Sequence, residues 1–224
     1  MDLLFTPAKL GTCELKNRIV RSATNGHLSD EKGQVTPLWA DTLIELAKNE
    51  VGLVITGHFC VDKMQRADAG QPVLDETTDE SLLRRACDGV HRYGGKLFFQ
   101  LSHSGIKGVE SVNGAPLKHP EDFTREELDR LVEQFAFAAK KCKESGADGV
   151  QVSGIDFNRR AGQKTPFYLD ALICEPDFAA KLKSGAQDGS KCLACNGCYT
   201  IYRKRFVRCV QHQDEIEQFK TIPW

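Results

Sequence analysis

The sequence predicts an α/β fold built around a parallel sheet. Short apolar runs alternate along the chain with segments of helical periodicity, which is typical of βα units. One of these runs, VGLVIT at 51–56, is continuously apolar, as a strand buried on both faces of a parallel sheet requires. No internal repeat or low-complexity segment interrupts the pattern. We therefore expect a layered α/β domain with its helices packed on the sheet.

The first predicted βα unit lies in the N-terminal quarter of the chain. Arg18–Val20 is the first strand candidate. Thr36 followed by Pro37 suits an N-cap and first helical residue, and predicts a helix that ends near Asn49. The apolar run 51–56 then forms the second strand.

The second helix and third strand follow at once. Thr77 and Glu80 have the spacing of a capping box and predict a helix that ends near Tyr93. The Gly-Gly pair at 94–95 stops that helix, because glycine readily adopts the left-handed conformation of a C-terminal cap. The run KLFFQL at 96–101 is the third predicted strand.

A longer helix precedes the fourth strand. Thr124 and Glu127 form a second capping-box pattern, and Gly146 ends the helix that follows. Gly149–Ser153 is the fourth strand. The predicted buried face of the helix has apolar residues at spacings of three and four: Leu128, Leu131, Val132, Phe135, Ala138, Ala139 and Cys142.

Composition narrows the class of protein. Hydrophobic residues make up 41% and charged residues 27%, which is typical of a globular domain. Thirty basic and 31 acidic side chains leave a formal charge of −1, which argues against nucleic acid or an anionic membrane as partner. No apolar run approaches the roughly 20 residues of a membrane span, and the N-terminus lacks the pattern of a signal peptide. We expect a cytoplasmic protein.

Four of the nine cysteines gather near the C-terminus, in a pattern typical of a metal site. Four thiolates can form a tetrahedral zinc site or hold an iron–sulfur cluster, and the spacing leaves both open. We therefore divide the chain into an α/β domain over 1–178 and a cysteine-rich metal-binding tail over 179–224. The four predicted ligands are Cys192, Cys195, Cys198 and Cys209.

Several motifs resemble, in order, those of the old yellow enzyme family of FMN-dependent oxidoreductases, which includes 2,4-dienoyl-CoA reductase. They are LFTPAKLGTCELKNRIVRSATN at 4–25, GQVTP at 33–37, VGLVITG at 51–57, FFQLSHSG at 98–105, ALICEPDF at 171–178 and KCLACNGC at 191–198. The resemblance implies a (β/α)₈ barrel with FMN at the carboxyl ends of its strands. A similarly placed cysteine run in dienoyl-CoA reductase relatives holds a [4Fe-4S] cluster, which favours that cluster here over zinc.

The resemblance also implies which residues contact the cofactor. Backbone groups of Ser22, Ala23, Thr24 and Asn25 would lie against the flavin. The second strand would contribute Gly57 and His58. Gln100 matches the glutamine whose amide, both a donor and an acceptor, bonds the pyrimidine edge of the flavin. His27 matches a position that lines the substrate pocket.

The chain also departs from the family pattern. A full barrel takes about 250 residues, and strands that hold the glycine-rich FMN-phosphate site are missing between Asp170 and Ala171. The fourth strand, with Ser153 and Gly154, matches either the family's fourth strand without its histidine pair and tyrosine, or its sixth. We therefore expect an incomplete (β/α)₈ barrel, whose unpaired strand edges predict either a homo-oligomer or incomplete order.

The family's chemistry gives the functional expectation. The resemblance implies an FMN-dependent oxidoreductase that takes electrons from NAD(P)H and reduces a small molecule such as an activated alkene. No residue stands out as the proton donor. The alternative is a non-catalytic truncated relative, or an interaction module that keeps only its metal-binding tail.

Overall fold

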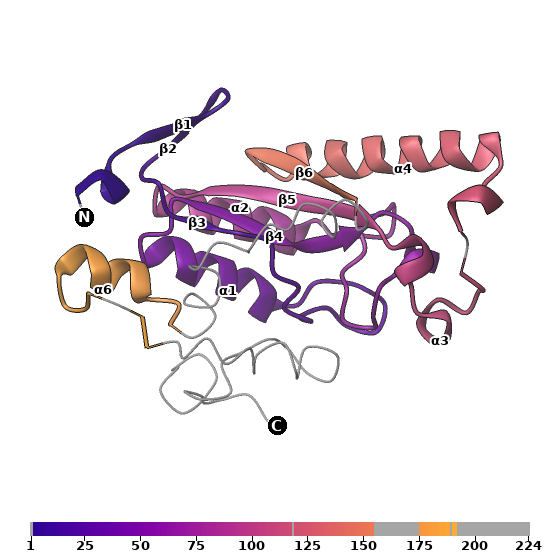
Figure 1. The fold of residues 1–224 in the computed structure, drawn as a ribbon, viewed down its shortest axis with the longest axis horizontal. Helices are drawn as coiled ribbons and strands as arrows, with labels where there is room; N and C mark the ends of the chain where they lie inside the picture. Colours follow the sequence, from indigo (N-terminus) through magenta and orange to yellow (C-terminus); the bar gives the residue numbers. More distant parts are fainter. Residues whose placement is uncertain (1, 118, 155–174, 189, 192–224) are drawn as a thin grey trace.

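The computed structural model describes residues 2–117, 119–154, 175–188 and 190–191. Its centre is a four-stranded parallel sheet in the order β3-β4-β5-β6. The predicted α/β class with a parallel sheet is confirmed (Figure 1). The strands are β3 Val20–Arg21, β4 Leu53–Cys60, β5 Lys96–His103 and β6 Gly149–Gly154.

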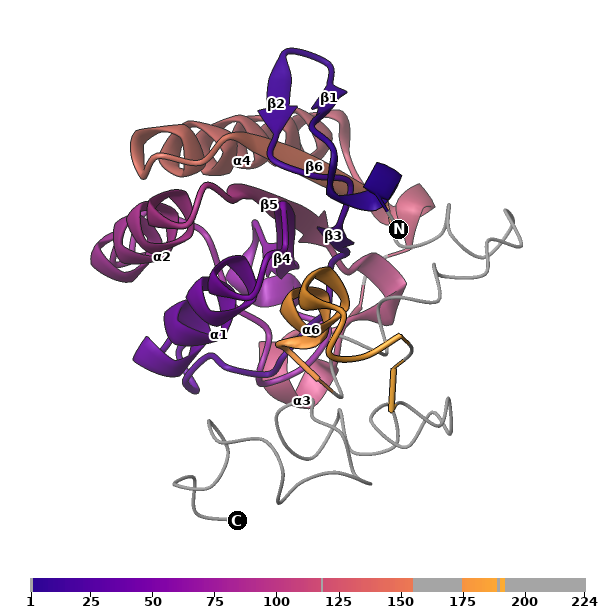
Figure 2. The same cartoon turned by 90° about the vertical axis from the view of Figure 1, so that its left-hand side faces the viewer.

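Three helices connect these strands and cover one face of the sheet. Figures 1 and 2 show α1 and α2 side by side, with α4 next to β6. The helices are α1 Pro37–Lys48, α2 Ser81–Arg92 and α4 Arg125–Glu144. Each lies between two consecutive parallel strands, as the βα pattern predicted.

The aromatic centre of the core joins α1 to the sheet. The Trp39 ring lies 5.7 Å from that of Phe59 and 6.1 Å from that of Phe99, and the two phenylalanine rings are 5.4 Å apart. Trp39 is 6% exposed and both phenylalanines are fully buried. Phe59 and Phe99 therefore mark the face of the sheet that the helices cover.

An antiparallel hairpin precedes the sheet, and the sequence pattern did not predict it. It consists of β1 Ala8–Leu10 and β2 Cys13–Leu15. Lys16, directly after the hairpin, donates its ammonium to the Ala47 carbonyl at 3.1 Å and to the Tyr93 carbonyl at 2.8 Å. A cation at these carbonyls complements the C-terminal ends of α1 and α2.

Helix boundaries test the capping predictions. The box at Thr124 and Glu127 is confirmed, because each side chain accepts a hydrogen bond from the other residue's backbone N–H. The box at Thr77 and Glu80 is wrong: the Thr77 hydroxyl donates to Asp75 at 2.6 Å, and the helix begins one residue after Glu80.

Removal of the confirmed cap gives a first prediction. We expect Thr124→Ala to lower the free energy of unfolding by about 1 kcal/mol, because the Glu127 N–H loses its acceptor at the start of a long helix. Thr124→Ser keeps a hydroxyl at the N-cap and should retain most of the stability. Urea denaturation measures both, and equal losses in the two variants would contradict the capping role.

The remaining described elements are short. Helical turns lie at η1 Asp2–Phe5, η2 Lys63–Gln65, η3 Gly105–Lys107, α3 Glu110–Asn113 and η4 Pro120–Asp122. Helix α6, Phe178–Ser184, packs Phe178 and Ala179 into the core. It begins at the last residue of the predicted 1–178 domain. The division at 178/179 stays a prediction, since most of the proposed tail lies outside the described residues.

Candidate functional site

A row of polar side chains crosses the sheet on the face opposite the aromatic core. His58 pairs in register with Gln100, and Gln100 pairs with Gln151. These three residues alternate with Phe59, Phe99 and other helix-facing residues, so their side chains lie on the other face. The Gln100 amide donates to the Gln151 amide oxygen at 2.7 Å. The row brings two predicted cofactor residues, His58 and Gln100, next to each other.

The same face is apolar closer to the strand N-termini. Ile55, Phe98 and Gly149 are neighbours in register across β4, β5 and β6. A Cβ on Gly149 would lie 2.8 Å from the Phe98 ring, so the ring needs a glycine beside it. Phe98 and Gln100 are half-buried and Gln151 is exposed within the described part of the chain. An apolar surface bordered by amides suits a flat aromatic ligand with a polar edge.

The segment that follows β3 packs directly against β4. A Cβ on Gly57 would lie 2.6 Å from the Thr24 carbonyl oxygen and 2.9 Å from the Asn25 Cα. Gly57 is therefore needed for the close approach of the two backbones. This contact brings together three of the predicted cofactor residues, Thr24, Asn25 and Gly57, beside β4.

A partly buried contact between His27 and Asp68 fixes the end of this segment. His27 Nδ1 lies 2.9 Å from Asp68, and the Asn25 amide donates to the same carboxylate at 2.9 Å. The His27 side chain is 7% exposed, and its backbone has a positive φ of 53°. Burial raises the pKa of the Asp68 carboxyl, but the hydrogen bond and charge of His27 outweigh that effect, and the pKa is lowered overall. The predicted role of His27 in substrate binding stays a prediction.

A second buried network holds His58. The amide nitrogen of the fully buried Gln71 lies 2.7 Å from His58 Nδ1 and 3.1 Å from the Ser102 hydroxyl. The Ser102 hydroxyl lies 3.0 Å from the same ring nitrogen. Burial lowers the pKa of His58. Gln71 and Ser102 thus hold the His58 ring at its Nδ1 side. The sequence pattern predicted neither residue.

The pKa of His58 gives a prediction about pH. Burial lowers the pKa of both His58 and His103, so the unfolded state takes up protons that the folded state excludes. Stability from these residues is complete above about pH 6.5, the ordinary histidine pKa, and is lost as the pH falls toward the lowered pKa values.

We therefore expect the free energy of unfolding to decrease from about pH 7.5 to about pH 5.5, with a weaker dependence in His58→Gln. His119→Gln is the matched control, because its side chain is 61% exposed. Urea denaturation across this range measures the effect. Stability that is constant or rises on acidification would contradict it.

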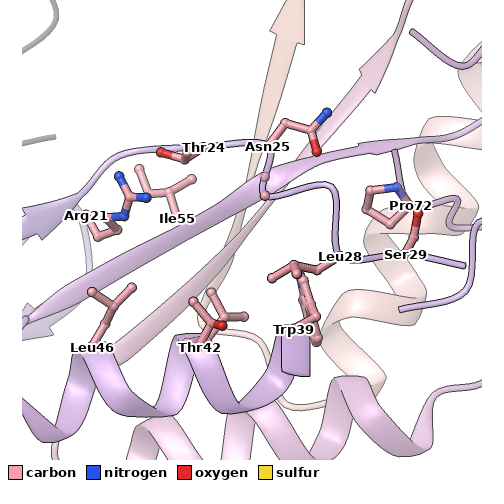
Figure 3. Close-up of a pocket in the computed structure, with 13 residues that line it drawn as sticks. Arg21, Thr24, Asn25, Leu28, Ser29, Trp39, Thr42, Leu46, Ile55 and Pro72 are labelled. Atoms are coloured by element: carbon pink, nitrogen blue, oxygen red, sulfur yellow. The ribbon is translucent and has the colours of Figure 1, made fainter. Parts of the chain in front are cut away.

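A small pocket lies between α1 and the segment that follows β3. In Figure 3, Trp39, Thr42 and Leu46 project from α1 toward the segment that carries Thr24 and Asn25. Its volume is about 70 Å³, well below the roughly 300–1,000 Å³ of typical ligand pockets. This pocket is therefore too small for a flavin-sized ring.

The predicted metal ligands lie outside the described residues. These are Cys192, Cys195, Cys198 and Cys209. Among the residues that the structure does describe, no group of His, Cys, Asp and Glu is arranged to hold a metal ion. The chain just before the cluster is anchored, because the Lys191 backbone N–H donates to the buried Glu175 carboxylate at 2.6 Å.

Comparison with known proteins decides the family. The model of the NADH:flavin oxidoreductase / NADH oxidase family matches residues 3–156, which is more than half of the 224 residues. The chain belongs to this family. The predicted old yellow enzyme relationship is thereby confirmed, and the polar row on β4, β5 and β6 lies within the matched stretch.

Relatives within the family are matched over part of their length. A metal reductase of Desulforamulus reducens is 34% identical over 169 residues, which is 68% of this chain and 24% of that protein. An NADPH dehydrogenase of Bacillus licheniformis is 30% identical over 162 residues, which is 67% of this chain and 48% of that protein. The chain thus spans between about a quarter and a half of these relatives' lengths.

Solved structures of old yellow enzymes share the fold. The enzyme from Pichia sp. AKU4542 gives a TM-score of 0.63 at 20% identity, and the match covers 79% of this chain and 54% of that one. The homologue from Zymomonas mobilis gives 0.60 at 22% identity, with 66% and 47% covered. The described sheet and helices thus correspond to part of the family's barrel, in agreement with the predicted incomplete (β/α)₈ fold.

Among the helices in the described ranges, none combines the length and apolar character that a membrane span requires.

Proposed function

We propose that the chain binds FMN on the open face of its sheet and acts as an NAD(P)H-dependent flavin oxidoreductase. The observation that carries the proposal is the register of His58, Gln100 and Gln151 beside an apolar surface. Membership of the flavin oxidoreductase family supports it independently. When bound, FMN would supply the hydride chemistry by accepting electrons from NAD(P)H and passing them to an acceptor.

The residues of this face have properties that fit the flavin ring. Ile55 and Phe98 offer an apolar surface for its flat face. The amides of Gln100 and Gln151 carry donors and acceptors for its pyrimidine edge, and their mutual hydrogen bond would be shared or exchanged on binding.

The segment after β3 would contribute its backbone. The Asn25 side chain is held by Asp68, so Ser22, Ala23, Thr24 and Asn25 would act through N–H and C=O groups. Gly57 allows the segment to lie close to β4. In this arrangement the protein orients the ring and leaves the redox chemistry to it.

The substrate class follows from the same proposal. A relative named cinnamate reductase from Clostridium sporogenes, 28% identical over 172 residues, supports a small activated alkene as acceptor. His27 would border the substrate, next to the segment after β3. Cytoplasmic location and a homo-oligomer that covers the strand edges belong to this proposal as well.

The C-terminal tail would add a second redox centre. Cys192, Cys195, Cys198 and Cys209 have the ligand number and type for a [4Fe-4S] cluster, with zinc as the alternative. The tail over 179–224 would then follow the flavin domain over 1–178. Such a cluster would pass single electrons to or from the flavin.

The test is an anaerobic absorbance spectrum of the purified chain, with FMN, iron, acid-labile sulfide and zinc quantified on the same sample. Flavin near one per chain, bleached by NADH or NADPH and restored by an activated alkene, is the expected result. Metal without flavin, even after incubation with FMN, would favour the alternative of a non-catalytic relative that keeps a metal-binding tail.

A further inference from the structure

The orientation of the Gln71 amide is fixed by a donor whose identity is certain. The backbone N–H of Ala67 donates to Gln71 Oε1 at 2.6 Å. A backbone N–H can only donate, so the atom facing it must be the amide oxygen. The other end of the amide, facing His58 Nδ1 at 2.7 Å, is therefore the NH₂ group, which can only donate.

This orientation determines where the His58 proton lies. The same NH₂ group also lies 3.2 Å from the His58 carbonyl, but a protonated Nδ1 would place two donors only 2.7 Å apart, so this contact favours an unprotonated Nδ1 that accepts through its lone pair. In a neutral imidazole the proton is then on Nε2. The Ser102 hydroxyl can donate to the same lone pair at 3.0 Å or to the Phe59 carbonyl at 3.4 Å, and both arrangements leave Nδ1 without a proton.

We propose that Gln71 and Ser102 are positioning residues that hold His58 as the neutral tautomer protonated at Nε2, so that its Nε2–H donates to an acceptor atom of the bound flavin. The donor would stand beside Gln100 in the polar row. The flavin contact rests on the proposed function, whereas the tautomer rests on the hydrogen bonds alone. No described residue accepts a hydrogen bond from Nε2.

The charged surroundings of His58 also bear on its protonation. Burial disfavours the imidazolium most, the Asp68 carboxylate favours it, and His27 opposes it, so the pKa is lowered overall. Protonation at Nδ1 would in addition place the Nδ1–H of His58 against the NH₂ group of Gln71, so that two donors would face each other. Both effects favour a neutral His58 whose N–H suits an oxygen or nitrogen lone pair.

The test is long-range ¹H–¹⁵N correlation NMR of the full chain labelled at its histidine nitrogens. The His58 signals are assigned by their loss in His58→Gln. We expect an unprotonated Nδ1 and a protonated Nε2 in the flavin-free chain throughout about pH 6–8. A protonated Nδ1 anywhere in this range would overturn the tautomer assignment.

Gln71→Glu reverses the hydrogen bond with almost no change in shape. The carboxylate can still accept from Ala67 but can no longer donate to Nδ1, so the proton should move to Nδ1 and the titration midpoint of His58 should rise. Gln34→Glu is the matched control, because Gln34 also accepts from a backbone N–H, that of Asp79. If the control shifts His58 as much as Gln71→Glu does, the positioning role is wrong.

A second variant covers the case in which the buried glutamate prevents folding. Gln71→Met removes the donor without adding charge, so both neutral tautomers of His58 should be populated in this variant. A ring that stays protonated at Nε2 alone would overturn the role of Gln71.

FMN binding to the same samples separates the two proposals. We expect Gln71→Glu to weaken FMN binding by about tenfold, the factor for one hydrogen bond of about 1.4 kcal/mol. The predicted tautomer in a chain that binds no FMN would overturn the flavin contact and the proposed function, and leave the tautomer assignment standing.

Discussion

Gly57→Ala is expected to destabilise the chain by about 2 kcal/mol and to weaken FMN binding at least about tenfold. The added Cβ would lie 2.6 Å from the Thr24 carbonyl and 2.9 Å from the Asn25 Cα, both of them backbone atoms. Backbone cannot move aside as a flexible side chain can, so the whole segment must shift away from β4. Because the proposed flavin contacts include backbone groups of that segment, the site should lose affinity together with stability.

Gly26→Ala is the matched control for this variant. Its Cβ would meet the end of the Leu28 side chain at 3.3 Å, which can adjust. Urea denaturation and titration with FMN followed by flavin fluorescence measure the two effects. If Gly57→Ala and Gly26→Ala behave alike in both assays, the close approach of the segment to β4 does not position the site.

Phe99→Ala should have the largest effect on stability, a loss of about 4 kcal/mol. Phe99 is fully buried and its ring lies 5.4 Å from Phe59 and 6.1 Å from Trp39. Its removal leaves a cavity between α1 and the sheet and eliminates two aromatic contacts. A loss of this size is a large fraction of the roughly 5–15 kcal/mol of a typical domain, so the variant should be partly unfolded at 37 °C.

Val152→Ala provides the comparison on the neighbouring strand. Val152 is on β6 and is 67% exposed within the described residues. Its truncation should change stability by less than about 0.5 kcal/mol. Comparable losses for Phe99→Ala and Val152→Ala in thermal and urea denaturation would contradict the location of the core described above.

Local chemistry predicted much of the fold. The helix predicted to start at Pro37 and end near Asn49 is α1, which ends at Lys48. The strand predicted at Gly149–Ser153 is β6, Gly149–Gly154. Proline at the start of α1 and a glycine at each end of β6 are local signals that act within a few residues.

Strand ends were harder to predict. The run at 51–56 became β4 at Leu53–Cys60, because pairing with β5 resumes at His58 after a register shift and continues to Cys60. The first strand also shifted, from Arg18–Val20 to Val20–Arg21. Pairing partners set these limits, and partners distant in sequence cannot be read from a local pattern.

The apolar face of α4 was predicted too broadly. Ala138 and Cys142 are fully buried, but Leu128 is 43% exposed and Val132 is 68% exposed. Helical periodicity identifies an apolar side, but the extent of burial depends on which elements pack against it. In the described residues α4 packs against β5 and β6, and its buried residues, Ala138 and Cys142, lie in its C-terminal half.

In the site too, residues within local motifs could be predicted, whereas residues brought in by contacts distant in sequence could not. The motifs indicated Gly57, His58 and Gln100, and the strand register brings His58 next to Gln100. Gln71 and Gln151 were not predicted. Gln71 reaches His58 from a loop 13 residues away, and Gln151 meets Gln100 across 51 residues. In the run GVQVS at 149–153, Gln151 stands between two valines, and a polar residue at that place in a strand could have identified it as a site residue.

The most direct test of the flavin site is titration of the chain with FMN, followed by flavin fluorescence, for the wild type, Gln100→Met and Gln134→Met. Gln134 is a half-buried glutamine on α4, away from the polar row, and serves as the control. The proposed site predicts saturable binding near one FMN per chain, weakened about tenfold by Gln100→Met and unchanged by Gln134→Met. No saturable binding, or equal binding by all three proteins, would contradict it.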